Sequence, residues 1–145
     1  MSVVLLAIAP GLTVDEVLTY WFRHDARLNL DLLNDLARLR DAGLRVYLAT
    51  NQEHLRAHYL MDTLDLSAHV DGCYYSAAIG HRKPAFEFFE IVASKVGLPP
   101  LELLLIDDAE ENVRAALQVG WHAARWTGRE RLNDLIARVT AATTN

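Results

Sequence analysis

The sequence has little of the features that mark secreted or membrane proteins. Its 145 residues include one cysteine, Cys73, so an intramolecular disulfide cannot form. The apolar run from Val3 to Ala9 is too short to cross a bilayer and has no basic segment before it. These absences predict a soluble, cytoplasmic protein that does not associate with membranes.

Negatively charged side chains outnumber positively charged ones, and the formal net charge is -5 at pH 7. Such a chain has no basic field to attract a nucleic-acid backbone or anionic lipid, which excludes a sequence-independent nucleic-acid binder. A hydrophobic content of 52% with 7 glycines and 4 prolines excludes disorder and low-complexity structure. The length is enough for one domain with a single core, so residues 1–145 are expected to form one domain.

Short apolar runs alternate with segments of helical periodicity along the whole chain. The predicted strands cover residues 3–9, 44–49, 72–75, 103–106 and 121–126. The predicted helices cover residues 14–22, 30–42, 53–64, 84–96, 110–119 and 130–139. This alternation predicts an α/β domain, a three-layer Rossmann-like parallel sheet with helices on both faces.

Polar residues follow two of the predicted strands directly. Thr50 and Asn51 end one strand, and Asp107 and Asp108 end another. Ligands of parallel sheets bind beyond the carboxyl ends of the strands, although a turn or helix cap is the alternative for Thr50 and Asn51. Adjacent carboxylates repel each other, and a cation or a network of donors offsets that repulsion. Capping of the helix that begins near Glu110 is the other role open to the two aspartates.

Lysine is rare enough in this chain for its position to be informative. The sequence has 12 arginines and two lysines, so Lys83 indicates a place where a compact ammonium is needed, with an ordinary surface lysine as the alternative. The hydroxyl, amide, ammonium and carboxylate groups described so far are those that hold a phosphoryl group and a divalent metal.

The order of these groups resembles that of the haloacid dehalogenase (HAD) superfamily of phosphatases and related hydrolases, over residues 30–128. The segment VYLATN at 46–51 is similar to the second motif of that family, an apolar strand that ends in threonine or serine. The segment RKP at 82–84 matches the third motif, and IDD at 106–108 with ENV at 111–113 matches the fourth. The resemblance implies a HAD-like fold and a hydrolase of phosphate esters that uses Mg²⁺.

The resemblance also assigns roles to residues. Its phosphate and catalytic residues are Thr50, Asn51 and Lys83, and its metal residues are Asp107 and Asp108, supported by Asn112. By analogy with the family, Thr50 binds the phosphoryl oxygens, Lys83 neutralises them together with the nucleophile, and Asp108 ligates Mg²⁺.

The first motif of the family departs from the pattern. The family has an aspartate nucleophile and a second aspartate, an acid and base, at the end of its first strand, where this chain has Ala7 and Ala9. Alanine cannot attack phosphorus, ligate a metal or transfer a proton. We therefore expect a phosphatase-type protein that keeps the phosphate and Mg²⁺ half-site, binds Mg²⁺ weakly and is catalytically impaired. The alternative is a non-catalytic phosphate-binding or protein-interaction domain.

The N-terminal region has two interpretations. Residues 1–29 either include a divergent first strand or are a remnant of the family's cap region. We favour a strand in the centre of the sheet, because its loss would leave the neighbouring strands unpaired. The spacing leaves no room for a complete cap domain, so a large ligand or a second copy of the chain would close the site. The partners expected are a phosphorylated small molecule or a phosphoprotein, and a homodimer.

Two other interpretations match part of this pattern. A receiver domain has a similar set of residues, but its acidic pair comes before the threonine and lysine, the reverse of the order here. His54 and His58 have the i, i+4 spacing of a metal pair but lack the His-Glu-x-x-His pattern of metal hydrolases.

Overall fold

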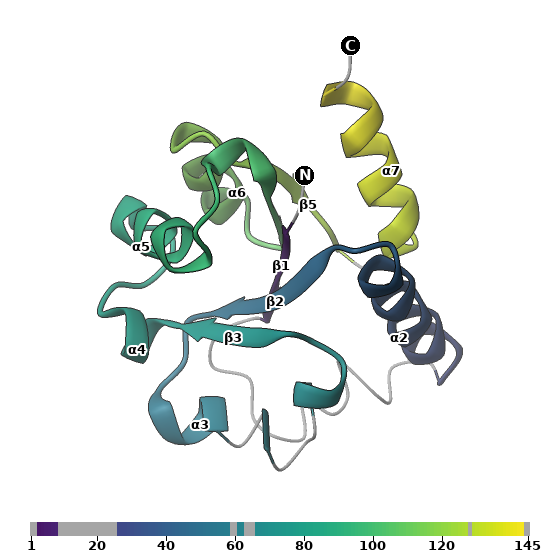
Figure 1. Ribbon diagram of the computed structural model, residues 1–145, viewed down its shortest axis with the longest axis horizontal. Helices are drawn as coiled ribbons and strands as arrows, with labels where there is room; N and C mark the ends of the chain where they lie inside the picture. The colour runs from purple at the N-terminus through teal and green to yellow at the C-terminus, as the bar shows by residue number, and fades with distance from the viewer. Residues whose placement is uncertain (1–2, 9–25, 59–60, 63–65, 128, 144–145) are drawn as a thin grey trace.

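The computed structural model describes residues 3–8, 26–58, 61–62, 66–127 and 129–143. In this part of the chain five strands form one parallel sheet with the order β3-β2-β1-β4-β5 (Figure 1). The strands are β1 (Val3–Ile8), β2 (Arg45–Thr50), β3 (Gly72–Tyr75), β4 (Leu103–Asp107) and β5 (His122–Arg125). The α/β fold predicted from the alternating pattern is confirmed.

Helices cover both faces of the sheet. The described helices are α2 (Ala26–Asp41), α3 (His54–His58), α4 (Ser76–Ile79), α5 (Phe86–Val96), α6 (Glu110–Gln118) and α7 (Leu132–Thr143), with short 3₁₀ turns at Leu66–Ala68 and Pro100–Glu102. Figure 1 shows α2 and α7 on one side of the sheet and α5 and α6 on the other. Leu36 and Leu135 belong to one core cluster, and Phe88 and Ala116 belong to the other, so each face of the sheet has its own core.

The first apolar run lies in the centre of the sheet, as the sequence analysis favoured. Val3, Val4 and Leu5 are completely buried, because β1 pairs with β2 on one side and with β4 on the other. A strand enclosed in this way has no polar face, which explains why its sequence is a continuous apolar run rather than an alternating one.

Two predicted helices are wrong in one respect each, the packing of Leu55 and the start at Pro84. Within the helix predicted at 53–64 the structure describes α3 and a π-helical turn at 61–62, and Leu55, expected to point inward, is 82% exposed. Pro84 does not open a helix, because Ala85 has a non-helical backbone (φ -58°, ψ 135°) and serves as the N-cap of α5, which begins at Phe86. Both predictions relied on apolar spacing or proline position alone, and neither signal fixes which turn packs against the sheet.

Two further helices differ from the prediction. Helix α2 begins at Ala26, four residues before the predicted start, and α4 was not predicted, because four residues are too few to show a helical period. The helix predicted at 14–22 and Ala9 lie outside the described residues. None of the described helices combines the length and the apolar character needed to cross a bilayer.

Candidate functional site

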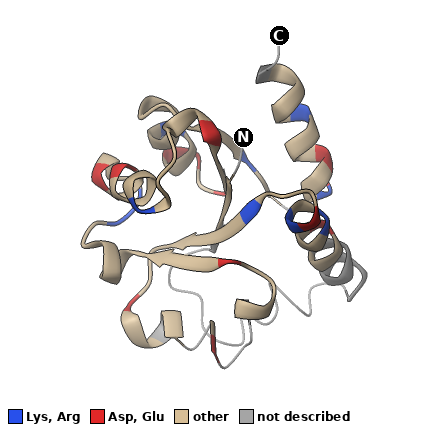
Figure 2. Ribbon diagram, viewed as in Figure 1, with Lys and Arg blue, Asp and Glu red and all other residues tan. Residues whose placement is uncertain are grey.

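The polar residues singled out in the sequence gather at the carboxyl ends of the central strands. Thr50 is the last residue of β2 and Asp107 is the last residue of β4. The loop between α4 and α5, basic in Figure 2, brings Lys83 to the same edge of the sheet. Parallel strands thus place residues from three distant parts of the sequence in one cluster.

Lys83 is the centre of this cluster. Its side chain is 1% exposed, and its Nζ donates to the Ala49 carbonyl oxygen and to Asp107 Oδ2, each at 2.8 Å. Burial lowers the pKa of the Lys83 ammonium below its ordinary value, and the charge of Asp107 opposes that shift. The ordinary surface lysine considered as an alternative is therefore wrong.

Asp107 is held by three donors. Its Oδ2 also accepts a hydrogen bond from Asn112 Nδ2 at 3.0 Å, and its Oδ1 accepts one from the Ala109 backbone N–H at 2.9 Å. The carboxylate is buried, so these donors and Lys83 replace the water it loses. This network also fixes the start of α6, where Ala109 is the N-cap.

Asp108 has a different environment, although it is the next residue. Its side chain is exposed, and its backbone carbonyl accepts a hydrogen bond from Arg125 Nε at 2.9 Å. Partial burial, and then the neighbouring charge of Asp107, raise the pKa of the Asp108 carboxyl above its ordinary value. The repulsion expected from two adjacent carboxylates therefore falls on Asp108.

Asn51 fixes the loop that carries Lys83. Its Nδ2 donates to the Lys83 carbonyl oxygen at 3.0 Å, and its Oδ1 accepts from the Lys83 backbone N–H at 2.8 Å. This two-way amide contact joins the end of β2 to a loop 32 residues away in the sequence. Thr50, immediately before it, is completely buried.

The backbone of β1 passes between the two groups that Lys83 binds. Ala7 pairs with Ala49 of β2, and Leu6 pairs with Ile106 of β4. Ala7 therefore lies beside Ala49 of β2. On the other side of β1, the residue of β4 that comes next after the last paired residue is Asp107. The Lys83 ammonium consequently spans the end of β1 at the level of an alanine.

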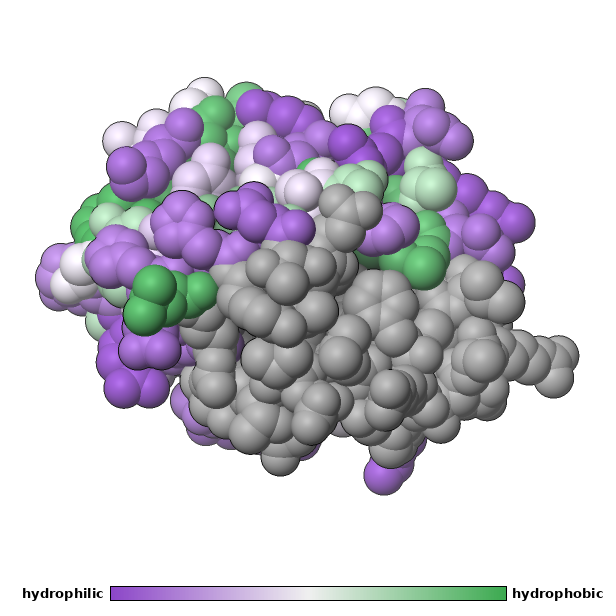
Figure 3. Space-filling view, turned by 90° about the horizontal axis from the view of Figure 1, so that it is seen from below, coloured by the Kyte–Doolittle hydropathy of each residue, from purple (hydrophilic) through white to green (hydrophobic). Residues whose placement is uncertain are grey.

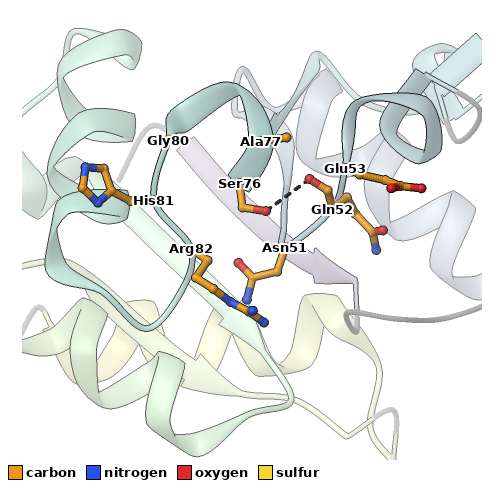
Figure 4. Close-up of a pocket in the computed structure, with 8 residues that line it drawn as sticks. All are labelled: Asn51, Gln52, Glu53, Ser76, Ala77, Gly80, His81 and Arg82. Atoms are coloured by element: carbon orange, nitrogen blue, oxygen red, sulfur yellow. Dashed lines mark hydrogen bonds between the residues drawn. The ribbon is translucent and has the colours of Figure 1, made fainter.

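An open pocket of about 640 Å³ adjoins this cluster (Figure 4). Its walls come from the residues after β2 and from α4 with the loop that follows it: Asn51, Gln52, Glu53, Ser76, Ala77, Gly80, His81 and Arg82. Figure 4 shows Arg82 extending towards Asn51 and His81 extending away from the other labelled side chains. Asn51 is shared by the pocket and the Lys83 cluster.

Sequence reasoning missed Gln52 and Arg82 as pocket residues. Each is adjacent to a residue that was singled out, since Gln52 follows Asn51 and Arg82 precedes Lys83, and that adjacency was the available signal. The two histidines weighed as a metal pair have separate partners. His54 Nδ1 shares a hydrogen bond with the Tyr75 hydroxyl at 3.0 Å, and His58 lies 3.7 Å from Asp62.

Comparison with known proteins identifies the family. A family model for haloacid dehalogenase-like hydrolases matches residues 14–120, which is most of the chain. The chain belongs to the haloacid dehalogenase-like hydrolase family. The match begins after β1, so the strand that carries Ala7 lies outside it.

Curated relatives of this HAD-like chain include phosphatases. The chain is 36% identical over 98 residues to a sesquiterpene phosphatase of Aspergillus oryzae, which covers 68% of this chain and 48% of the relative. It is 28% identical over 129 residues to a phosphoglycolate phosphatase of Salmonella typhi, which covers 86% of this chain and 46% of the relative. The chain therefore spans about half the length of these curated relatives.

Solved structures share the fold. An uncharacterised protein from Corynebacterium glutamicum has a TM-score of 0.68 at 20% identity, with 97% of this chain and 93% of that chain covered. A HAD family enzyme from Bacteroides thetaiotaomicron, an aspartate-to-alanine mutant in complex with magnesium and inorganic phosphate, has a TM-score of 0.67 at 18% identity. That match covers 93% of this chain and 98% of the enzyme.

The described residues offer Mg²⁺ one exposed carboxylate, that of Asp108. Within the described ranges, no group of three or more histidine, cysteine, aspartate or glutamate side chains is placed to hold a metal. Both oxygens of Asp107 already accept hydrogen bonds from protein donors, which leaves Asp108 as the exposed carboxylate of the pair. Mg²⁺ bound through one carboxylate keeps most of its water ligands, and such binding is weak.

Proposed function

We propose that this chain is a phosphatase-type HAD protein that holds phosphate esters and is impaired in their hydrolysis. The phosphate would lie at the edge formed by Thr50, Asn51 and Lys83, with Asp107 and Asp108 on the metal side. The observation that carries the proposal is the Lys83 ammonium, which bridges Ala49 and Asp107 across the end of β1.

The impairment of hydrolysis follows from the presence of Ala7 at this point of β1. Covalent phosphoryl transfer needs an oxygen nucleophile beside the phosphorus atom, and the side chain of Ala7 is a methyl group. Removing the nucleophile from an enzyme with a covalent mechanism costs on the order of 10⁶ in kcat. Ala9, the counterpart of the acid and base, removes the proton transfer as well.

Phosphate binding requires attraction to the anion, but it does not require the nucleophile or the proton transfer that hydrolysis needs. The Lys83 ammonium would donate to a phosphate oxygen as a charge-assisted hydrogen-bond donor, although the Asp107 carboxylate balances its charge. Mg²⁺, when bound at Asp108, would add positive charge for the same anion. The Bacteroides thetaiotaomicron relative, an aspartate-to-alanine mutant with magnesium and phosphate, supports the view that loss of an aspartate leaves phosphate binding in place.

The ligand that we propose is a phosphorylated small molecule. The curated relatives include a sesquiterpene phosphatase and a phosphoglycolate phosphatase, so they share phosphatase chemistry and differ in the rest of the ligand. A homodimer, expected from the lack of a complete cap, stays a prediction that sedimentation equilibrium would test.

Hydrolysis of a generic aryl phosphate in the presence of Mg²⁺ tests the proposal. The unaltered chain is compared with Asp108→Ala and with the double variant Ala7→Asp, Ala9→Asp. We expect the unaltered chain and Asp108→Ala to match the rate without protein, and the double variant to exceed it. Activity in the unaltered chain that is lost in Asp108→Ala would show that an unrecognised nucleophile acts here.

A further inference from the structure

A second groove runs along α6 beside the start of α5. Its volume is about 400 Å³, and its walls come from Pro84 and Phe86 and from a face of α6 between Glu110 and Gln118. The lining residues of α6 recur at intervals of three and four, so they form one face of the helix over about two turns. This α5–α6 groove shares no residue with the Lys83 cluster or with the pocket in Figure 4.

Phe86 gives the α5–α6 groove an aromatic wall. The residue lies in the first turn of α5 and is 46% exposed, whereas the exposed leucines at 55, 101 and 117 do not line the groove. Figure 3 shows hydrophobic residues as separate patches among hydrophilic ones on the described part of one face. Separate apolar groups suit contacts through single anchoring side chains better than the broad hydrophobic interface of an obligate dimer.

Negative charge surrounds this aromatic wall. Glu110 pairs with Arg114 at 3.0 Å, so these two charges balance each other. Glu111, which lines the groove, and Glu90 are exposed, and neither forms an ion pair with any residue that the structure describes. Glu90 follows Phe86 by four positions, which places it on the same face of α5 one turn further on. Figure 2 shows the acidic residues of α5 in red.

Stabilisation of the helices accounts for one of these two glutamates. Glu111 lies in the first turn of α6, where a carboxylate complements the positive end of the helix dipole. Glu90 lies in the middle of α5 and has no such role. A carboxylate in the groove, a second one nearby and an exposed aromatic ring together favour a cationic side chain that can stack on the ring.

We propose that the α5–α6 groove binds an arginine side chain in a basic segment of a partner protein. A guanidinium is planar, stacks on aromatic rings and pairs with carboxylates, so it would stack on Phe86 and pair with Glu111, while Glu90 adds negative charge for the rest of the segment. A purely apolar anchor would bury Glu111 without a cation, and an acidic segment would be repelled. The inference does not rest on phosphate binding.

Titration of the full, isotope-labelled chain with two peptides, followed by NMR, tests the proposal. The first peptide is acetyl-Gly-Ala-Leu-Arg-Ala-Leu-Gly-amide, and the second has citrulline, which is uncharged and of the same shape, in place of arginine. We expect the arginine peptide to shift the amide signals of the groove residues and to bind about fivefold or more tightly than the citrulline peptide, the ratio for one ion pair with a cation–π contact. Phe86→Ala and Glu111→Gln should each weaken binding of the arginine peptide several-fold.

Matched controls are Leu101→Ala and Glu53→Gln, exposed residues outside the groove, and they should leave the affinity unchanged. Equal affinity for the two peptides, or signal changes only outside the groove, would overturn the inference, and this comparison uses the unaltered chain, so it does not depend on whether a variant folds. Sedimentation equilibrium tests the other occupant. A dimer that Phe86→Ala dissociates would show that a second copy fills the groove, and it would also overturn the inference.

Discussion

Replacement of Lys83 by methionine removes one charge of the buried pair and keeps a side chain of similar length. The Asp107 carboxylate would then retain the Asn112 amide and the Ala109 N–H as donors and lose the ammonium at 2.8 Å. Both side chains of the pair are 1% exposed, so water cannot replace the lost partner. Breaking a buried ion pair in this way costs about 3–5 kcal/mol.

That loss is large beside the stability of a domain of this size, which is about 5–15 kcal/mol. Urea unfolding, followed by the fluorescence of the buried Trp121, measures it. Lys95→Met is the matched control, because Lys95 is the other lysine of the chain and is exposed in the last turn of α5. We expect the control to cost less than about 1 kcal/mol.

A second variant separates the missing charge from the missing side chain. In Lys83→Met, Asp107→Asn both charges are gone, so no carboxylate is left buried without its cation. The double variant should recover about 1–3 kcal/mol of the loss, the usual coupling within one hydrogen-bonded network. A cost below about 1 kcal/mol for Lys83→Met alone, the value of an exposed ion pair, would refute the reasoning.

Three further predictions concern residues around the site and the helix pair behind it. The pKa of the Asp108 carboxyl is raised above its ordinary value, so the folded chain binds a proton more readily than the unfolded chain. The free energy of unfolding therefore falls as the pH rises from the unfolded-state pKa through the folded-state pKa. Asp108→Asn should therefore be more stable than the parent at neutral pH and lose that advantage below pH 3.8, as urea midpoints will show; equal midpoints at neutral pH would contradict this. Asn51→Asp removes the donor to the Lys83 carbonyl, and we expect faster amide exchange of the loop after α4; unchanged exchange would count against its anchoring role. Asp35 is buried and accepts from Arg131 and from the Asn133 backbone N–H. Arg131→Ala leaves this carboxylate buried without its cation, whereas Asp35→Ala leaves a guanidinium that is 43% exposed and can be hydrated, so Arg131→Ala should be the more destabilising of the two; the reverse order in thermal unfolding would contradict this.

The parts of the fold that the sequence revealed are those with strong local patterns. The continuous apolar run of β1 indicated a strand enclosed on both sides, and it lies in the centre of the sheet. The adjacent Asp107 and Asp108 indicated a cation or a donor network, and the structure shows donors from Lys83, Ala109 and Asn112 around Asp107. Both signals reflect an energetic requirement: an apolar strand must be buried on both faces, and two adjacent carboxylates need a cation or donors to offset their repulsion. Few structures meet either requirement.

The parts that the sequence concealed depend on contacts between distant residues. Nothing near Asn51 in the sequence indicates that its amide binds the backbone of Lys83. The two residues are 32 positions apart, and only the fold of the chain between them brings them together. Leu55 has the spacing of an inward helical residue, yet its side chain is exposed in α3. Periodicity shows that a helix has an apolar stripe, and tertiary packing decides where that stripe ends.

The central claim is that a phosphate site persists here without the carboxylate that forms a covalent phosphoryl intermediate. Incubation with a radiolabelled phosphate ester and Mg²⁺, followed by acid quenching, detects phosphoryl groups attached to the protein. We predict no label on the unaltered chain and label on the double variant Ala7→Asp, Ala9→Asp. Label on the unaltered chain that disappears in Asp108→Ala would contradict the account, because it would show covalent chemistry at a site that lacks the expected nucleophile.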